Sequence, residues 1–429
     1  MATTSIITNY NTMRHLQLLF FISIVIGLCN CGSSNEPTPP VDPPIDKPTE
    51  TDDIKTDPNK TFIHPGMLHG DEDFLHIKAK VDAKQEPWLS GWNKLINNSH
   101  TSKNYKPNPV ETLIRAGNAS KWNNNFNRAF HDAAAAYQQA LCWKITGDEA
   151  YATKAVEILN AWGKTCKKID GDSDRYLGAG LYGYQFANAA EIMRDYKGWN
   201  AEDFTQFKNM MLTVFYPKNK DFLDRHNNAC ITHYWANWDL CNIASAMAIG
   251  ILADDASKYN YAIDYLMKGK GNGRMKTAIY HVHEGHLGQM QESGRDQNHT
   301  LLCIGLLGTI CEMAWHQGDD LYGYDNNRLL AGAEYAARYN FANLPVPFKH
   351  YNNCDNVNHT EVREKGRGEH RPIWQMIYNH YVVRKGIQAP YTKLAVRVNH
   401  PEGGGGNYNP NSGGYDSLGF GTLLYNSQD

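Results

Sequence analysis

The side chains best suited to chemistry lie in two short polar segments, 226–239 and 289–299. Each leads directly into a strongly apolar stretch, 240–252 or 301–315, with the composition of a buried helix. A helix N-terminus carries unpaired N–H groups and the positive end of the helix dipole, so both segments can receive an anion such as a carboxylate. The candidate residues are His233, Tyr234, Asn237, Trp238 and Asp239 in the first segment and Glu292, Arg295, Asp296, Gln297 and His299 in the second.

A purely structural role is an alternative explanation for each of these residues. Asn237 can serve as a plain helix cap, and Arg295 can form a structural ion pair with Asp296. The second segment nevertheless holds more polar side chains than capping requires. A third polar segment, 367–372, contains Arg371 and is followed at helical spacing by Tyr378. All three segments are therefore candidate parts of one site.

The composition is that of an ordinary globular protein, with 429 residues, 41% hydrophobic and 20% charged. The net charge of -3 gives no overall attraction for nucleic acid or another polyanion, so positive charge must be local to a cleft. Nine cysteines at this length do not indicate a disulfide framework. Cys142, Cys303 and Cys311 lie in apolar helical runs and are predicted to be buried free thiols. No zinc-like spacing occurs, and we expect neither a metal nor an organic cofactor.

Helical periodicity dominates the chain, and strand-like alternation is scarce. Gly147 and Asp148 form a stop and a start signal between two of the expected helices. Helices are predicted over 128–144, 151–162, 183–196, 202–215, 238–253, 257–268, 300–316, 326–339 and 372–385. Consecutive antiparallel pairs over this length predict an all-α fold, an α/α toroid with a central cleft and a loop-rich C-terminal tail. A simple helical bundle is the alternative.

The N-terminal region has the features of a lipoprotein signal peptide. Met13-Arg14-His15 precedes an apolar run from Leu16 to Leu28, too short to span a bilayer, and Cys31 follows in a lipobox-like context. Residues 32–61 are rich in proline and acidic residues, which predicts an extended tether. We therefore expect a signal peptide over 1–31, a tether over 32–61 and a folded domain over 62–429. Lipid on Cys31 would anchor the protein in the periplasm or on the outer-membrane surface of a Gram-negative bacterium.

Three strings of the sequence resemble the alginate lyase superfamily of helical-toroid lyases, closest to the branch of broad alginate and glucuronan lyases. They are His64-Pro65-Gly66-Met67-Leu68-His69, Asn237-Trp238-Asp239 and the run Glu-Ser-Gly-Arg-Asp-Gln-Asn-His from Glu292 to His299. The similarity covers residues 62–429. One departure concerns the Asn-Asn-His-x-Tyr-Trp string of the classical members. Here Asn227-Asn228 is separated from His233-Tyr234-Trp235 by an insertion.

The resemblance implies β-elimination on a 1,4-linked polyuronate. Such a reaction needs donors that neutralise the uronate carboxylate, a base at C5–H and an acid at O4. We assign Asn237 as principal neutraliser, supported by Arg295 and Gln297. His299 and His233 are candidate bases and Tyr234 is the candidate acid, with Tyr378 in reserve. The expected substrate-binding residues are Gln297, Glu292, Trp238, Arg371 and Tyr378.

Two other functions fit parts of the pattern. A glycoside hydrolase on an α/α barrel needs two carboxylates, and Glu292 with Asp239 or Asp296 can supply them. A non-catalytic glycan-capture lipoprotein needs an aromatic platform in place of the charged cluster. We expect a monomer that acts on an acidic polysaccharide. The preference among mannuronate, guluronate and glucuronate, and endo or exo action, stay open.

The lipobox predicts that Cys31→Ser gives a soluble, secreted protein, because the variant lacks the thiol that would carry the lipid. Fractionation of cells into membrane and soluble parts, followed by detection of the protein, measures this. A variant that stays in the membrane fraction would contradict a lipid at Cys31.

Overall fold

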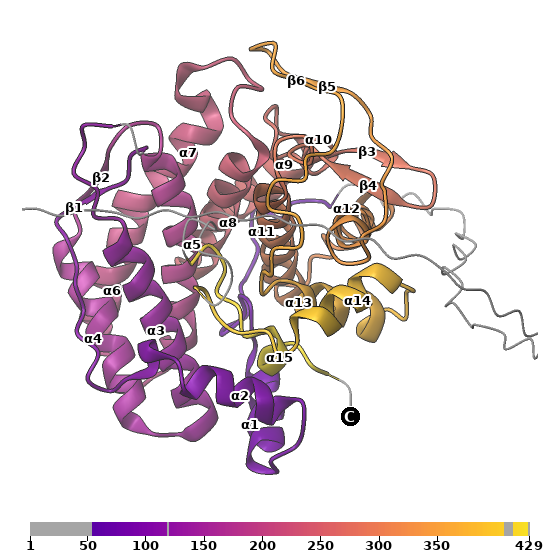
Figure 1. Cartoon of the computed structure of the whole chain (residues 1–429). Coiled ribbons are helices and arrows are strands. Elements are labelled where there is room, and N and C mark those ends of the chain that lie inside the picture. The colour runs from indigo at the N-terminus through magenta and orange to yellow at the C-terminus, as the bar shows by residue number, and fades with distance from the viewer. Residues whose placement is uncertain (1–53, 118–119, 407–414, 428–429) are drawn as a thin grey trace, which may run out of the picture. The chain divides into compact units, whose positions relative to one another are not determined.

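Helices form most of the structure, a computed structural model that describes residues 54–117, 120–406 and 415–427 (Figure 1). The predicted signal peptide and most of the predicted tether lie outside the described residues. The α-helices are α1 (Asp71–Asp82), α2 (Trp88–Ile96), α3 (Asn127–Thr146), α4 (Glu149–Thr165), α5 (Arg175–Met193), α6 (Ala201–Met210), α7 (Tyr216–Arg225), α8 (Ala236–Leu252), α9 (Ala256–Lys268), α10 (Met275–Ala278), α11 (Gln297–His316), α12 (Tyr324–Asn340), α13 (Trp374–Tyr378), α14 (Pro390–Asn399) and α15 (Gly421–Leu424).

Shorter elements complete the chain. The 3₁₀ turns are η1 (Ser99–Thr101) and η3 (His226–Asn228), and the π-helical turns are η2 (Met211–Phe215) and η4 (Asn379–Arg384). The strands are β1 (Thr112–Ile114), β2 (Lys168–Asp170), β3 (Ile279–His283), β4 (Leu287–Met290), β5 (Tyr351–Asn352) and β6 (Asn358–His359). They form three two-stranded sheets, parallel for β1 and β2 and antiparallel for the other two pairs. The predicted scarcity of strands is confirmed for the described residues.

The helices α5, α8 and α11 form the buried centre of the fold, and nearly every residue in each of them is buried (Figure 1). A helix that is apolar on all sides requires neighbours on all sides. Gly180 of α5 faces Cys241 of α8, and Arg194 just after α5 donates to the carbonyl of Leu252 at the end of α8, so the two helices run parallel. The outer helices return antiparallel to them, as at Gly250 of α8, which faces Tyr259 of α9. The predicted α/α toroid is confirmed.

Local signals explain where helices begin and end. Gly147 ends α3 with a left-handed φ of 72°, and the Asp148 side chain accepts from the Ala150 N–H at 2.9 Å to start α4, as predicted. The start of α5 was missed, because a helix was predicted only from residue 183. Gly178, Gly180 and Gly183 weaken the sequence signal there. A Cβ at position 180 would lie 2.3 Å from the Cys241 Sγ, so glycine is required for close helix packing.

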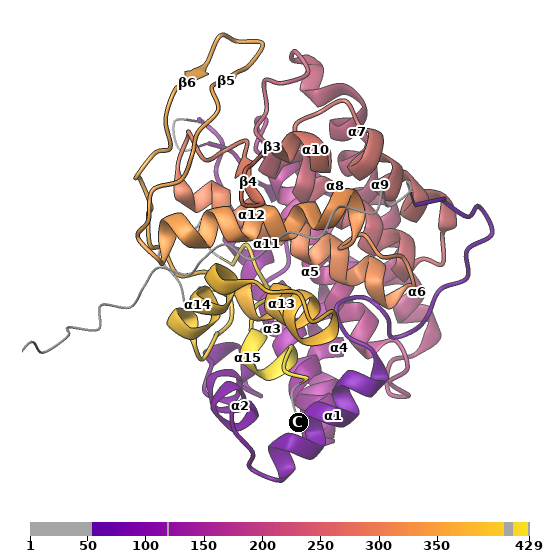
Figure 2. The same cartoon turned by 90° about the vertical axis from the view of Figure 1, so that its right-hand side faces the viewer.

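The C-terminal tail packs against the middle of α5. The Tyr184 hydroxyl donates to the Asp416 carbonyl at 2.5 Å, and the Gln185 amide donates to the Tyr415 carbonyl at 2.6 Å. Helices α13, α14 and α15 gather beside this tail (Figure 2). Within the described part of the chain, no helix combines the length and hydropathy needed to cross a bilayer.

The cysteines of the described residues are either buried free thiols or members of one disulfide. Cys142, Cys303 and Cys311 are buried free thiols as predicted, and Cys166 and Cys241 are buried free thiols as well. Cys230 and Cys354 form a disulfide that the sequence analysis did not predict. The two residues are 124 positions apart, and their spacing matches no disulfide pattern.

A buried carboxyl group in the tail predicts a specific pH dependence of stability. Glu402 Oε1 accepts from the backbone N–H groups of Trp374 and Gln375, and burial raises the pKa of Glu402 from 4.5 to about 8. Between these two values the folded state holds a proton that the unfolded state has lost. The free energy of unfolding therefore falls as pH rises through this window, by at most about 1.4 kcal/mol per pH unit, and levels off above it.

Glu402→Gln should remove this pH-dependent loss, because the amide keeps an acceptor oxygen and cannot ionise. Denaturant unfolding at several pH values between 5 and about 9 measures the effect. The exposed Glu361→Gln is the control and should retain the wild-type pH dependence. Identical pH dependence in Glu402→Gln and wild type would contradict the assignment.

Candidate active site

The candidate site lies at the end of the fold where the inner helices begin. The first turns of α8 and α11 meet there through segment 289–299, which was predicted to carry chemistry. Parallel inner helices place their N-termini at one end, so their dipoles and free N–H groups contribute positive potential at that end. A protein with a net charge of -3 can thus still attract an anion locally.

Glu292 is the central group of the site and is fully buried. Its Oε1 accepts from the Asn237 backbone N–H at 2.9 Å and from the Asn237 side-chain amide at 2.7 Å. Its Oε2 accepts from Arg295 Nη1 at 2.8 Å. The Cys303 thiol also contacts Oε1, at 3.3 Å. One buried carboxylate therefore joins the first turn of α8 to the segment before α11 and fixes the direction of Arg295.

Arg295 offers its charge to the solvent side of the site. Its side chain is 28% exposed, and its guanidinium lies over the Trp235 ring at 5.1 Å. Trp235 in turn stacks on His359, with ring centroids 5.5 Å apart and an interplanar angle of 4°. A guanidinium has five N–H donors, so Arg295 can bind Glu292 and still donate to a ligand carboxylate.

His299 and Asp296 form a hydrogen-bonded pair beside Arg295. Asp296 caps α11 by accepting from the His299 N–H, and both carboxylate oxygens lie 2.8 Å from His299 Nδ1. Burial alone would raise the pKa of Asp296, but the hydrogen bond and charge of His299 hold it below its ordinary value. An ionised Asp296 orients the imidazole through Nδ1. Because His299 is 33% exposed, Nε2 can act as a base toward a ligand.

Asn237 and Gln297 are buried and use their amides within the protein. The Asn237 amide is bound to Glu292, and Gln297 donates to the Ser293 and Arg363 carbonyls while accepting from Asn340. These contacts favour positioning roles for both residues: Asn237 orients Glu292, and Gln297 attaches the 363–366 backbone to α11. The direct contact with a ligand carboxylate then belongs to Arg295.

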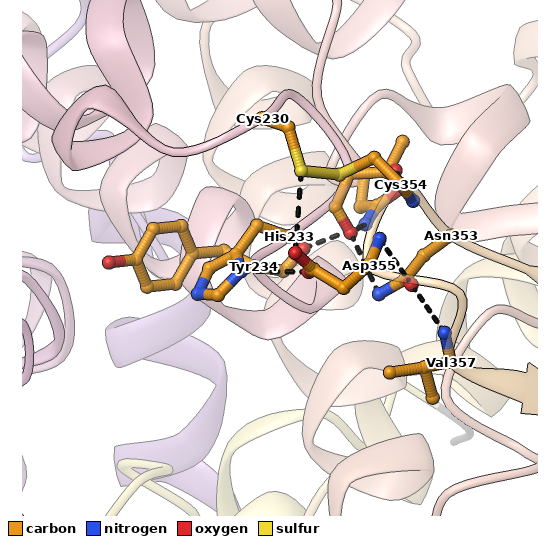
Figure 3. Close-up of a disulfide and its surroundings, with 9 residues drawn as sticks. Cys230, His233, Tyr234, Asn353, Cys354, Asp355 and Val357 are labelled. Atoms are coloured by element: carbon orange, nitrogen blue, oxygen red, sulfur yellow. Dashed lines mark hydrogen bonds and ion pairs between the residues drawn. A yellow bond between two sulfur atoms is a disulfide. The ribbon is translucent and has the colours of Figure 1, made fainter.

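His233 and Tyr234 lie on the loop before α8, beside the Cys230–Cys354 disulfide (Figure 3). His233 is 45% exposed, and its Nδ1 lies 2.8 Å from an Asp355 carboxylate oxygen. The buried Tyr234 hydroxyl accepts from the Asn227 amide at 2.9 Å. Among the described contacts, none joins either residue to Arg295 or His299. The structure thus brings His299, and not His233, next to Arg295.

The remaining predicted ligand contacts have different surroundings. Arg371 is buried and donates to an Asp416 carboxylate oxygen at 3.1 Å, and its guanidinium also lies 4.0 Å from Glu369. Burial raises the pKa of Glu369, and the positive charge of Arg371 opposes that shift. Trp238 packs on Phe222 at 5.8 Å, and Tyr378 is half-buried on α13. The substrate-binding roles of Arg371, Trp238 and Tyr378 stay predictions.

Three residues near the site were missed by sequence reasoning. Arg115, after β1, donates to the Tyr182 hydroxyl at 2.7 Å, and its charge acts on Asp416. Trp235 and His359 form the stacked pair beneath Arg295. Trp235 is part of the string His233-Tyr234-Trp235 but was given no role there, although its aromatic ring was an available signal. Arg115 and His359 are isolated in sequence, and only the fold brings them to the site.

A single group of potential metal ligands occurs in the described part of the chain, at Cys230, Cys354 and Asp355. The two sulfur atoms are bonded to each other, so they cannot act as thiolate ligands. This group therefore offers no metal centre to the chemistry of the site.

Comparisons with known proteins agree with the fold. Residues 79–345 match the alginate lyase family. An alginate lyase from Bacteroides ovatus has a similar structure, with a TM-score of 0.56 and 14% identity over 85% of this chain and 100% of that chain. Alginate lyase A1-III from Sphingomonas species A1 gives a TM-score of 0.55 and 15% identity, over 85% of this chain and 100% of that chain. No curated protein matches the chain in sequence.

The two candidate bases can be separated by mutation. His299→Ala should lower kcat, assayed on alginate, by about a hundredfold or more, the usual contribution of a positioned general base. His233→Ala should keep a kcat near that of wild type, although His233 is also paired with an aspartate. Steady-state kinetics and thermal unfolding of both variants measure this. The reverse pattern, at unchanged melting temperatures, would move the base to His233.

Proposed function

The chain belongs to the alginate lyase family of polysaccharide lyases, and on that premise we propose that it cleaves a 1,4-linked polyuronate, alginate or glucuronan, by β-elimination. The observation that carries this proposal is the placement of Arg295 next to the His299–Asp296 pair. A cation for the carboxylate and a base for the adjacent C–H are two of the three groups that the reaction requires, and the third is an acid for O4.

Each step of the proposed reaction uses a group whose position is fixed. The Arg295 guanidinium binds the uronate carboxylate, so the charge that develops on removal of the C5 proton is stabilised. His299 Nε2 removes that proton, and Asp296 stabilises the imidazolium that forms. The C4–O4 bond then breaks, which leaves a double bond between C4 and C5. Arg295 is held in place by Glu292, so little reorganisation is needed as the charge develops.

The same imidazole, that of His299, can donate a proton to the leaving oxygen O4. The Tyr234 side chain is largely buried, and none of the described contacts joins its hydroxyl to Arg295 or His299, so we place the acid at His299 instead. A protonated His299 can return its proton to O4 when C5–H and O4 lie on the same face of the sugar. Mannuronate and glucuronate have this arrangement, whereas guluronate is inverted at C5. We therefore propose a preference for mannuronate or glucuronate over guluronate.

A glycoside hydrolase is less compatible with the site. Glu292 is fully buried and bound to Asn237 and Arg295. Asp239 is also buried, and it accepts from the Gly273 N–H and contacts His226. Two carboxylates that flank a scissile bond need access to substrate, which neither of these has.

The proposed location is the periplasm or the outer-membrane surface, with a lipid on Cys31. The Cys230–Cys354 disulfide supports an oxidising compartment, because disulfides persist in secreted and periplasmic proteins and are rare in the cytosol. A lipid-anchored lyase would act on polysaccharide at the cell surface.

Purified protein should release products with the ultraviolet absorbance of a conjugated double bond from polymannuronate or polyglucuronate, and much less from polyguluronate. His299→Ala in the same panel controls for a contaminating lyase. New reducing ends without absorbance would indicate hydrolysis. Binding with no change in polymer length would indicate a capture protein.

A further inference from the structure

The segment 350–363 is attached to the candidate site from two directions. At its tip, Cys354 is bonded to Cys230 of the loop before α8, and the Cys354 N–H donates to the Thr232 hydroxyl at 2.8 Å (Figure 3). Asp355 in the same turn binds His233. The disulfide therefore adds a covalent bond between two parts of the chain that are 124 residues apart and that these hydrogen bonds also join.

The other end of this segment contacts the residues around Arg295. The Arg363 N–H donates to the Ser293 carbonyl at 3.0 Å, and the Gln297 amide donates to the Arg363 carbonyl at 2.9 Å. His359 lies against Gly294, where an added Cβ would come within 2.6 Å of it. The stretch 293–297 is thus lined by the 359–363 backbone on one side.

His359 links this segment to the cation of the site. Its ring stacks on Trp235, and the same Trp235 ring lies under the Arg295 guanidinium. Burial lowers the pKa of His359, and the positive charges of Arg363 and Arg295 lower it further, so the ring is neutral near pH 7. A neutral ring can support Trp235 without repelling Arg295.

We propose that His359 is a positioning residue for Arg295, acting through Trp235, and that the Cys230–Cys354 disulfide holds it there, which makes substrate binding dependent on the oxidised state. The proposal rests on the proposed function for its kinetic consequence. Both cysteines are exposed, so a reductant can reach the bond. A dithiol such as dithiothreitol supplies two electrons and two protons, gives two cysteine thiols and becomes a cyclic disulfide.

His359→Ala should raise KM on the preferred polyuronate by about tenfold, because a displaced Arg295 binds the uronate carboxylate less tightly. It should also lower kcat, because Arg295 stabilises the charge that develops on that carboxylate. His359→Phe keeps an aromatic ring for stacking and should restore most of the affinity. Val357→Ala, on the exposed part of the same hairpin, is the control and should match wild type. Equal KM values for His359→Ala and wild type would overturn the positioning role.

Reduction supplies the second test. Dithiothreitol should raise the wild-type KM, whereas the Cys230→Ser/Cys354→Ser double variant should have the raised KM from the start and show no response to the reductant. Mass spectrometry of alkylated thiols verifies which cysteines were reduced. A wild-type KM unchanged by full reduction of this disulfide would overturn the redox part of the proposal.

Hydrogen–deuterium exchange separates failure of this inference from failure of the proposed function. Peptides covering 291–299 should exchange faster in His359→Ala and in reduced wild type, whatever the substrate is. If they do so while no polyuronate is cleaved, the function is wrong and the structural coupling stands. If wild type cleaves polyuronate and exchange in 291–299 is unchanged, the coupling is wrong and the function stands.

Discussion

The buried carboxylate of Glu292 is the interaction on which the site depends. A fully buried charge is costly unless it is paired and hydrogen-bonded, and here Asn237 and Arg295 provide both. The same bonds fix the start of α8 against the segment that begins α11. Loss of the Arg295 side chain would leave an uncompensated charge in the interior, and loss of the Asn237 side chain would remove one of its hydrogen bonds. The geometry of Arg295 is thus maintained by the stability of the fold.

The helical frame supplies the field in which these groups act. The inner helices begin at one end of the fold, so their unpaired N–H groups add positive potential where Arg295 and His299 lie. The acidic residues of this region are buried and paired, as Glu292 and Asp296 are. The site can therefore be attractive to a polyanion although the whole chain is slightly acidic.

The sequence predicted those features of the structure that interactions between neighbouring residues determine. The Gly147–Asp148 break, the buried helices and the polar run from Glu292 to His299 are features of neighbouring residues, and each was confirmed as part of the fold. Contacts between distant residues were not predictable in the same way. Tertiary structure alone brings His359 and the Cys230–Cys354 disulfide to the site. The spacing of these residues in a single sequence does not predict their contacts. Asn237 was predicted at the correct place, but its burial against Glu292 was visible only in the structure.

The C-terminal tail contributes to the surroundings of the site. Asp416 binds Arg371, and its backbone carbonyl accepts from Tyr184 of the central helix α5. Burial raises the pKa of Asp416, and the positive charges of Arg371 and Arg115 oppose that rise. Asp416 of the tail therefore interacts electrostatically with Arg115, which follows β1, with Arg371, and more weakly with His299. These parts span most of the chain, so the electrostatic environment of the base depends on tertiary contacts that include the packing of Asp416 against α5.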